Sequence, residues 1–441
     1  MTDQGTCRQP EFQPPPPSPG WGAGQLAGSG QIVALYVAFF VSHGVAVPYL
    51  PVAMKRLGLD GDAIGLAMAC SLVVQFATPP VWGYLADRWG GSRLLLATAS
   101  VGAVAGMVAA CALPGPLGFL LGFLLFAFSR TPVSPLLDAR ALRHPAVGPA
   151  GYGRVRRWGS VGFVAAVAGV GAVLDVLPAR AIPALVAVPW LAMFCLALAG
   201  GPGLDSSSLH AGRPPLARLY AQRSVWAFLF LSALHAGAGV PFETYFAVHA
   251  ADHGLPGRII GLAWAAGVGF EVLVLSCLGT LIARLGPRRL LLIAYGAGVV
   301  RWGLTAALPG GAALAAVQVL HGLTFGASFG ASVVWMSRAV PRELANSSQS
   351  VFAAVAWGLG GIVAQLVCGP VYQRLGGQFL FAAAAVCELL PFAGMLLLRE
   401  PVEPQGPCKV PGDDFGNPVS SPPRKRGSRI DATPGFPLSR E

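Results

Sequence analysis

Long apolar stretches recur along most of the chain, and they limit what it can fold into. A helix needs about 20 apolar residues to cross the hydrocarbon core of a bilayer. We place twelve such stretches between Gln31 and Leu398. Their approximate centres are Phe40, Val73, Val104, Leu124, Val167, Val188, Ser232, Val268, Gly296, Phe325, Ala356 and Gly394. The pattern predicts an all-α polytopic membrane protein of twelve transmembrane helices.

The composition also places the chain in a membrane. Hydrophobic residues make up 54% of the 441 residues and charged residues only 11%, which is too little polar surface to cover a soluble globule of this size. The net charge of +11 comes largely from arginines in short loops and in the C-terminal segment. This distribution favours membrane orientation over a nucleic-acid partner. The eight cysteines show no metal-ligand spacing, so we expect no metal, cofactor or disulfide.

One loop sequence occurs twice, each time between apolar stretches. "GYLADRWGGSRLLL" begins at Gly83, and "GTLIARLGPRRLLL" begins at Gly279. The matching positions are Gly83, Leu85, Arg88, Gly90 and Arg93 in the first copy and Gly279, Leu281, Arg284, Gly286 and Arg289 in the second. Asp87 has no counterpart, because Ala283 takes its place. The repeat indicates a duplicated unit and hence two pseudo-symmetric bundles of six helices.

The bundles can be bounded from this duplication and from the polar segments. We expect a disordered, Pro-rich cytoplasmic tail over residues 1–29 and a first bundle over 30–200. A cytoplasmic linker over 201–223 then leads to a second bundle over 224–399. Residues 400–441 are expected to form a disordered, basic cytoplasmic tail.

The cations are distributed unequally between alternate loops. If both termini are inside, the outer loops hold only Lys55, Arg56, Arg180, Arg258 and Arg374. The inner loops hold Arg88, Arg93, Arg140, Arg143, Arg154, Arg156, Arg157, Arg213, Arg218, Arg223, Arg284, Arg288, Arg289, Arg338 and Arg342. Because positive charge accumulates on the cytoplasmic side, we expect a cell-membrane protein with both termini in the cytoplasm.

Several ionisable side chains fall within the apolar stretches. Each costs roughly 3 kcal/mol or more at mid-membrane unless it faces water or a partner. They are Arg130, Asp138, Glu243, Glu271, Arg301 and Glu388, together with His43, His235 and His321. Such residues are candidates for substrate and proton binding.

The fourth stretch carries three polar residues on one helical face. Arg130, Ser134 and Asp138 recur at intervals of four. Arg130 and Asp138 would lie about 12 Å apart along the axis, so each needs a partner on another helix. Pro132 and Pro135 interrupt the backbone between them, which is tolerated where a span lines a cavity. We therefore expect Arg130 in a substrate cavity.

Asp138 has two interpretations. It takes part in proton coupling, or it lies at the cytoplasmic end of its helix and pairs with Arg140 or Arg157.

Glu271 and Arg301 are the first candidates for a proton-coupling pair. A carboxyl group deep in a span can exchange a proton near neutral pH with each side of the membrane in turn. The alternative is a permanent structural ion pair between the two. Trp264 precedes Glu271 by seven residues and lies on the same helical face.

The remaining cavity candidates are His43, His235, Glu243, Trp264 and His321. Each histidine is as well explained by a satisfied structural role as by contact with substrate or proton. The aromatic side chains suit stacking on an aromatic substrate, although packing and lipid contact also use such residues.

The repeated loop resembles the signature of the major facilitator superfamily between its second and third helices, approximately GxLaDrxGrr. The order of "VPYLPVAMKRLGL", "SPLLDARAL", "YGRVRRWGSVGF" and "LHGLTFGASF" is similar to that of the phenylpropionate permease group, and more distantly to nucleoside and oligosaccharide proton symporters. The resemblance covers about Gln31 to Arg399 and implies the major facilitator fold. It also implies a gating role for Asp87, Arg88 and Arg93, while Ser92 departs from the usual basic residue.

Three classes of function are compatible with a membrane protein of this kind. The chain has no GxxxxGK[ST] loop and no HExxH motif, so a nucleotide-driven pump or a membrane enzyme is disfavoured. We expect a monomeric secondary transporter of a small organic solute, favouring an aromatic or organic acid carried with protons. The alternatives are a proton-coupled sugar or nucleoside permease and a non-transporting membrane sensor.

Overall fold

The computed structural model describes residues 23–399, except for 80, 83, 86–91, 114, 145–146, 200–222, 309–310 and 341–344. Every regular element in these ranges is helical. Residues 1–22 of the predicted first tail, the predicted second tail over 400–441 and the predicted linker lie outside the described residues, apart from Arg223, where a helix begins. The first helix begins at Ala23 rather than at residue 30.

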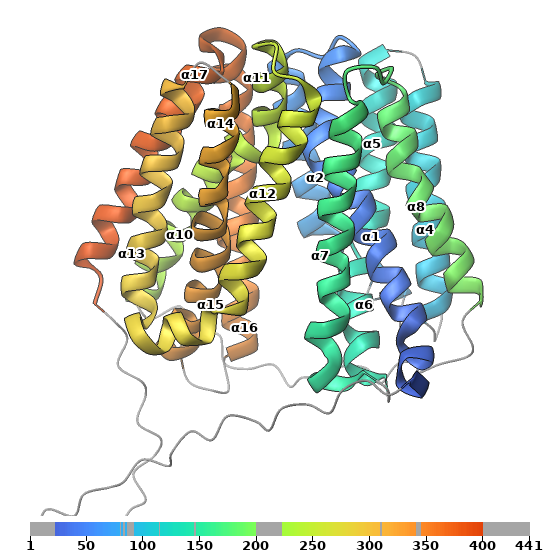
Figure 1. Ribbon diagram of the computed structural model, residues 1–441, viewed down its shortest axis with the longest axis horizontal. Helices are drawn as coiled ribbons and strands as arrows, with labels where there is room; N and C mark the ends of the chain where they lie inside the picture. The colour runs from blue at the N-terminus through green and yellow to red at the C-terminus, as the bar shows by residue number, and fades with distance from the viewer. Residues whose placement is uncertain are drawn as a thin grey trace, which may run out of the picture. The chain divides into compact units, whose positions relative to one another are not determined.

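The helices fall into two sets along the chain (Figure 1). The first set is α1 (Ala23–Arg56), α2 (Gly61–Ala77), α4 (Ser92–Ala112), α5 (Gly115–Arg130), α6 (Val133–Arg143), α7 (Gly148–Val173) and α8 (Ala181–Ala199). The second set is α10 (Arg223–Val240), η1 (Pro241–Tyr245), α11 (Phe246–Asp252), α12 (Gly257–Ser276), α13 (Leu278–Ala307), α14 (Gly311–Val317), η2 (Gln318–Leu320), η3 (Gly322–Ala327), α15 (Ser328–Ala339), α16 (Ala345–Phe352), η5 (Ala353–Leu359) and α17 (Gly360–Leu397).

All twelve predicted span centres lie in helices. Within the described ranges, nine helical segments are long and apolar enough to cross a membrane. The shorter α2 and the arginine-bearing α7 are not among them, and the segment Ser348–Leu397 contains two of the predicted centres. The all-helical membrane architecture is confirmed, while the count of twelve spans stays a prediction.

Two glycines turn the chain inside continuous helical segments. Gly286 in α13 has φ of 74° and Gly376 in α17 has φ of 79°. Positive φ is readily adopted only by glycine, because a Cβ atom would clash with the backbone. Gly286 belongs to the second copy of the repeated loop, so this turn explains why that copy has a glycine at this position. The short helical part before Gly286 meets the long span after it at this point.

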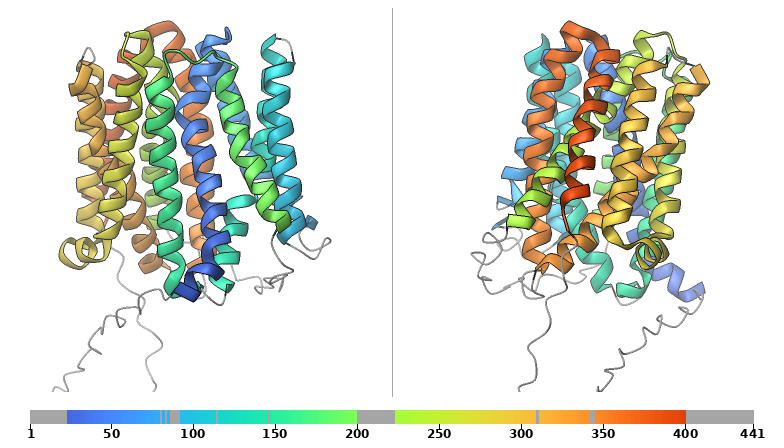
Figure 2. Two further views of the ribbon diagram at one scale, coloured as in Figure 1. Left: turned by 45° about the vertical axis from the view of Figure 1, so that its right-hand side comes forward. Right: turned by 90° about the vertical axis from the view of Figure 1, so that its left-hand side faces the viewer.

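The helices of each set run side by side (Figure 2). In the first set α1 packs on α7 and α8, and α4 packs on α5 and α8. In the second set α17 packs on α10 and α13. Large apolar side chains such as Val108, Leu121 and Leu390 are exposed on the outside, as expected where lipid is the solvent.

The two sets meet near one end of the helices, away from the start of α1 (Figure 1). Lys55 forms an ion pair with Asp252, and the Gln373 side chain accepts a hydrogen bond of 2.8 Å from the Gly61 amide. Asp175 accepts two hydrogen bonds, of 2.9 and 3.0 Å, from the single Gly257 amide. Each of these contacts joins the first set to the second, so that end is closed.

Replacing Gly286 with alanine should destabilise the protein. The Gly286 backbone, with ψ of 160°, lies in a region that is essentially restricted to glycine, and forcing a Cβ into it costs on the order of 1–3 kcal/mol. Thermal unfolding of the purified protein measures the loss. Gly279→Ala is the matched control from the same repeat, because no atom lies within 4 Å of a Cβ placed there. Equal unfolding temperatures for the two variants would contradict the turn at Gly286.

Candidate functional site

The predicted gating loop is described only in part. Gly83, Asp87, Arg88 and Gly90 lie outside the described residues. Arg93, at the start of α4, donates to the carbonyl oxygen of Leu198 near the end of α8. A guanidinium group at a helix C-terminus satisfies unpaired carbonyls and opposes the negative end of the helix dipole.

The second copy of the loop makes an equivalent contact one residue earlier than the repeat predicts. Arg288 donates to the carbonyl oxygens of Leu398 at 2.8 Å and Leu396 at 2.7 Å, at the end of α17. Gly279, Arg284 and Arg289 are exposed. The loop therefore ties the start of one span to the end of another in each set, through Arg93 and Arg288.

Arg130 is placed by a break in the backbone. It ends α5, and the turn Thr131–Pro132 separates it from α6. Its Nη1 lies 3.2 Å from Nδ1 of His43 in α1, and its Nη2 donates to Oε1 of Gln75 in α2 at 3.0 Å. The expectation of a partner on another helix is confirmed. Both partners are uncharged or weakly basic, and within the described ranges no Asp or Glu forms an ion pair with Arg130.

Asp138 belongs to a different group. Its Oδ1 accepts hydrogen bonds from Nη1 of Arg156 at 2.8 Å, from the Tyr36 hydroxyl at 2.6 Å and from the Tyr152 hydroxyl at 3.0 Å. The alternative interpretation expected an ion pair with an arginine, and such a pair forms, but its partner is Arg156. Arg140 and Arg157 were the wrong partners, because Arg140 donates to Gln31 at 3.2 Å and Arg157 is exposed. Tyr152 and Arg156 are four residues apart on α7, a helical spacing that could have indicated them. The coupling role of Asp138 stays a prediction.

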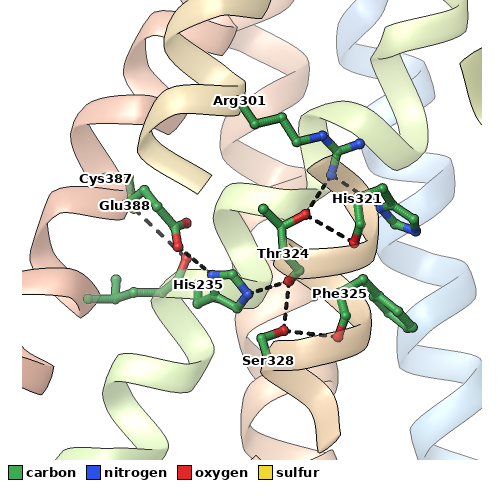
Figure 3. A network of polar contacts seen from close by, with 9 residues as sticks. His235, Arg301, His321, Thr324, Phe325, Ser328, Cys387 and Glu388 are labelled. Carbon is green, nitrogen blue, oxygen red and sulfur yellow. Dashed lines mark hydrogen bonds and ion pairs between the residues drawn. The ribbon is translucent and has the colours of Figure 1, made fainter. Parts of the chain in front are cut away.

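Arg301 lies in the interior of the second set (Figure 3). Only 1% of it is exposed, and its guanidinium carbon lies 4.1 Å from the ring centre of Phe242. It donates to Gln318 at 3.1 Å and to the Thr324 hydroxyl at 2.8 Å, and its Nη1 lies 3.2 Å from Nδ1 of His321. Its Nη2 has no hydrogen-bond partner among the described residues.

His321 stands between the two members of the predicted coupling pair. Its Nε2 lies 3.4 Å from Oε2 of Glu271, while its Nδ1 contacts Arg301. The permanent ion pair between Glu271 and Arg301 that the sequence allowed is therefore not formed. Both residues contact a single imidazole, whose two nitrogens can each give or accept a proton.

A small cavity brings several predicted residues together. His235, Glu243, Arg301 and His321 line it, with Phe242 and Thr324. Trp264 stacks on Phe242 with ring centres 4.2 Å apart. Within the described ranges no three His, Cys, Asp or Glu side chains gather as metal ligands would.

Two π-helical segments shape this cavity. Glu243 lies in η1 and Thr324 in η3, and wide turns of this kind are frequent at functional sites. Gln75 and Gln318 are further polar partners that the sequence reasoning missed. Each is an uncharged polar residue inside an apolar stretch, and this position could have indicated a buried polar contact.

The chain matches the model of the "MFS_1 like family" over residues 31–383. The protein belongs to the major facilitator superfamily. Within that family it is 30% identical to the "Probable 3-phenylpropionic acid transporter" of Escherichia coli (strain K12), over 80% of this chain and 93% of the relative. It is also 30% identical to the "Maltose permease" of Geobacillus stearothermophilus, over 86% of this chain and 96% of the relative.

Solved structures support the same fold. The nucleoside transporter NupG aligns with a TM-score of 0.75 at 18% identity, over 84% of this chain and 98% of NupG. A bacterial homologue of the lysosomal transporter Spinster aligns with a TM-score of 0.61 at 13% identity, over 86% of this chain and 98% of that structure. The chain is thus a major facilitator transporter of organic solutes, and its family points to transport rather than catalysis.

The contact between Asp138 and Arg156 of this family member can be tested by a double-mutant cycle. Asp138→Asn and Arg156→Gln should each lower the free energy of unfolding, and their effects should be coupled by about 0.2–1 kcal/mol because the pair is partly exposed. Thermal or chemical unfolding measures the coupling. Arg157→Gln is the matched control, and its effect should be additive with that of Asp138→Asn. Coupling of Asp138→Asn to Arg157→Gln, with additivity toward Arg156→Gln, would identify Arg157 as the partner.

Proposed function

We propose that this transporter carries a small aromatic or other organic acid across the cell membrane, together with a proton, by alternating access. The observation that carries the proposal is the environment of Arg130. Its guanidinium group contacts His43 and Gln75, and neither supplies a negative charge. A cation within a membrane span needs an anion or water, and a carboxylate substrate would supply the anion with two hydrogen bonds.

Aromatic rings lie beside His43, the partner of Arg130, and beside the polar cavity of the second set. His43 stacks on Phe39 with ring centres 6.1 Å apart and lies 6.0 Å from the ring of Phe163. On the other side, Phe325 and Trp357 line the cavity of the second set. A planar apolar substrate with one carboxylate would use the rings for stacking and Arg130 for charge. The name of the Escherichia coli relative agrees with such a substrate.

Because the substrate is an anion, coupling to a proton removes the electrical cost of moving it into the cell. Moving a monoanion into a cell held at 100 mV inside negative costs about 2.3 kcal/mol, and one co-transported proton cancels the charge. Glu271 and His321 supply adjacent proton acceptors beside the buried Arg301. In this proposal Arg130 holds the substrate, and the group around His321 carries the proton.

The closed end of the molecule suggests which side the substrate reaches. Contacts between the sets gather where Lys55 meets Asp252 and where Asp175 meets Gly257. If the arginine-rich loops are cytoplasmic, that end is extracellular, and the structure corresponds to an inward-facing state. Rocking of one bundle against the other would then expose the site to the opposite side.

A neutral sugar is the second candidate. The Geobacillus stearothermophilus relative, a maltose permease, is as similar in identity as the phenylpropionic acid transporter. The hydroxyl groups of a sugar would need hydrogen-bond partners such as Gln75 and Glu243 instead of a lone cation. Its uptake with a proton would be driven by both the membrane potential and the pH gradient.

Uptake by reconstituted vesicles with an imposed pH gradient tests the proposal. We expect an aromatic monocarboxylate to accumulate and the outside medium to become alkaline as it enters. Maltose and nucleosides serve as the competing substrates. Accumulation of a neutral compound alone would exclude the acid-transporter proposal, and absence of flux for every compound would favour a sensor.

Arg130→Gln should weaken the binding of a carboxylate substrate. Loss of a hydrogen bond to a charged group costs about 1.5–3 kcal/mol, which corresponds to roughly a 10- to 150-fold loss of affinity. Binding to the purified protein measures the change. Arg258→Gln is the matched control, because Arg258 is exposed at the start of α12. Unchanged affinity in Arg130→Gln would remove Arg130 from the substrate site.

Glu271→Gln should separate substrate movement from proton movement. An amide can keep a hydrogen bond to His321 but cannot carry a proton, so gradient-driven accumulation should fall to the level reached without a gradient while counterflow exchange continues. Asp60→Asn is the matched carboxyl-to-amide control, since Asp60 is exposed and caps α2, and asparagine caps equally well. Accumulation that survives in Glu271→Gln would be incompatible with a coupling role.

A further inference from the structure

A second pair of ionisable residues lies inside the helices of the second set, apart from Glu271. His235 on α10 contacts Glu388 on α17 through its Nδ1 and the carboxyl Oε1 (Figure 3). His235 is 8% exposed and Glu388 is 0% exposed. The other ring nitrogen, Nε2, lies 2.7 Å from the carbonyl oxygen of Thr324. Every polar atom of the imidazole is therefore engaged.

The chemistry of these contacts fixes the number of protons in the pair. A carbonyl oxygen can only accept a hydrogen bond, so Nε2 of His235 carries a hydrogen. In a neutral imidazole Nδ1 is then an acceptor, and an ionised carboxylate would place two lone pairs against each other. The contact between Nδ1 and Oε1 therefore requires one further proton, shared between His235 and Glu388.

The second carboxyl oxygen indicates where that proton resides. Oε2 of Glu388 is buried and has no hydrogen-bond partner among the described residues. An ionised carboxylate would leave this oxygen with an unpaired negative charge in an apolar interior, which costs far more than a neutral carbonyl oxygen. The proton belongs on Oε1 of Glu388, which donates to Nδ1 of His235.

The surrounding residues form a fitted site for a neutral carboxyl group. A Cβ at Gly298 of α13 would lie 2.8 Å from both Cγ and Cδ of Glu388, so this glycine makes the room. The Tyr295 ring lies 4.6 Å from the His235 ring. The other titratable groups near the pair are Cys387 and, through electrostatic interaction, Arg301.

Thr324 connects the pair to the cavity. Its carbonyl oxygen accepts from His235, and its hydroxyl accepts from Nη1 of Arg301. His235 itself lines the cavity next to Arg301 and His321. A proton that passed from Oε1 of Glu388 to Nδ1 of His235 would lie on a side chain that lines the cavity with Arg301 and His321.

We propose that His235 and Glu388 form a proton-binding site that is distinct from Glu271 and holds one exchangeable proton on Glu388. Its use in transport rests on the proposed proton symport, whereas the presence of the proton does not. Loss of the proton would break the contact between the two side chains and leave a negative charge within reach of Arg301.

Infrared difference spectroscopy on the purified protein tests the site without any substrate. The spectrum of the wild type minus that of Glu388→Gln at neutral pH should contain the carbonyl band of a protonated carboxyl group. This band should shift in D2O, because the proton exchanges through His235. Glutamine can donate from its amide to Nδ1 of His235, so the variant keeps the contact and should fold. Glu271→Gln is the matched control and should retain the band.

Gly298→Ala provides a second variant that leaves both ionisable residues in place. The added methyl group occupies the space of the Glu388 carboxyl group and should alter the band, whereas Gly303→Ala on the same helix meets no atom within 4 Å and should not. In vesicles, Glu388→Gln should lower gradient-driven accumulation at least tenfold.

The outcomes separate the two proposals. Identical carboxyl regions for the wild type and Glu388→Gln, or a band that does not respond to D2O, would overturn the proton site. A D2O-sensitive band together with transport that ignores the pH gradient would support the site and count against the proposed symport.

Discussion

An ion inside an apolar medium must find a counter-charge, hydrogen bonds or water, and this requirement organises the interior of the protein. The described residues meet it in three ways. Asp138 is neutralised by Arg156 and held by two tyrosine hydroxyls. Arg301 donates to neutral acceptors and lies against the faces of two aromatic rings. Among the described residues Arg130 contacts only His43 and Gln75, so its charge is the least compensated of the three. That difference separates a structural ion pair from a candidate binding site.

The backbone is irregular where the polar groups gather. Regular helices would repeat side chains at fixed angles, whereas the wide turns in η1 and η3 rotate Glu243 and Thr324 relative to their neighbours. On α5 and α6 the same result comes from the Thr131–Pro132 turn. Gly298 adds a further adjustment by leaving space for a carboxyl group. These irregular turns weaken the local packing of the helices. The hydrogen bonds of the polar network offset that loss.

Much of this arrangement could be predicted from the sequence, because apolar length and the positions of charges are local properties. Every predicted span centre lies in a helix, and the repeated loop contains a turn at Gly286 that only glycine adopts readily. The partners of the buried ions were harder to predict. Arg156 rather than Arg157 faces Asp138, and His321 rather than Arg301 contacts Glu271. Rotation of one helix about its axis relative to another decides these contacts. Helical spacing, such as that of Tyr152 and Arg156, shows which residues share a face, but it does not show which helix that face meets.

The contact of Asp175 with the Gly257 amide has a consequence for helix α12. The residue before that helix, Pro256, offers no side-chain oxygen, so the first turn of α12 receives its cap from the opposite bundle. If the bundles part at this end, as the proposed alternating access requires, the helix would lose its cap and the positive end of its dipole would lose a carboxylate at the same moment. Fraying of the first turn of α12 would then accompany every opening, so hydrogen exchange at these amides would report the transport cycle directly.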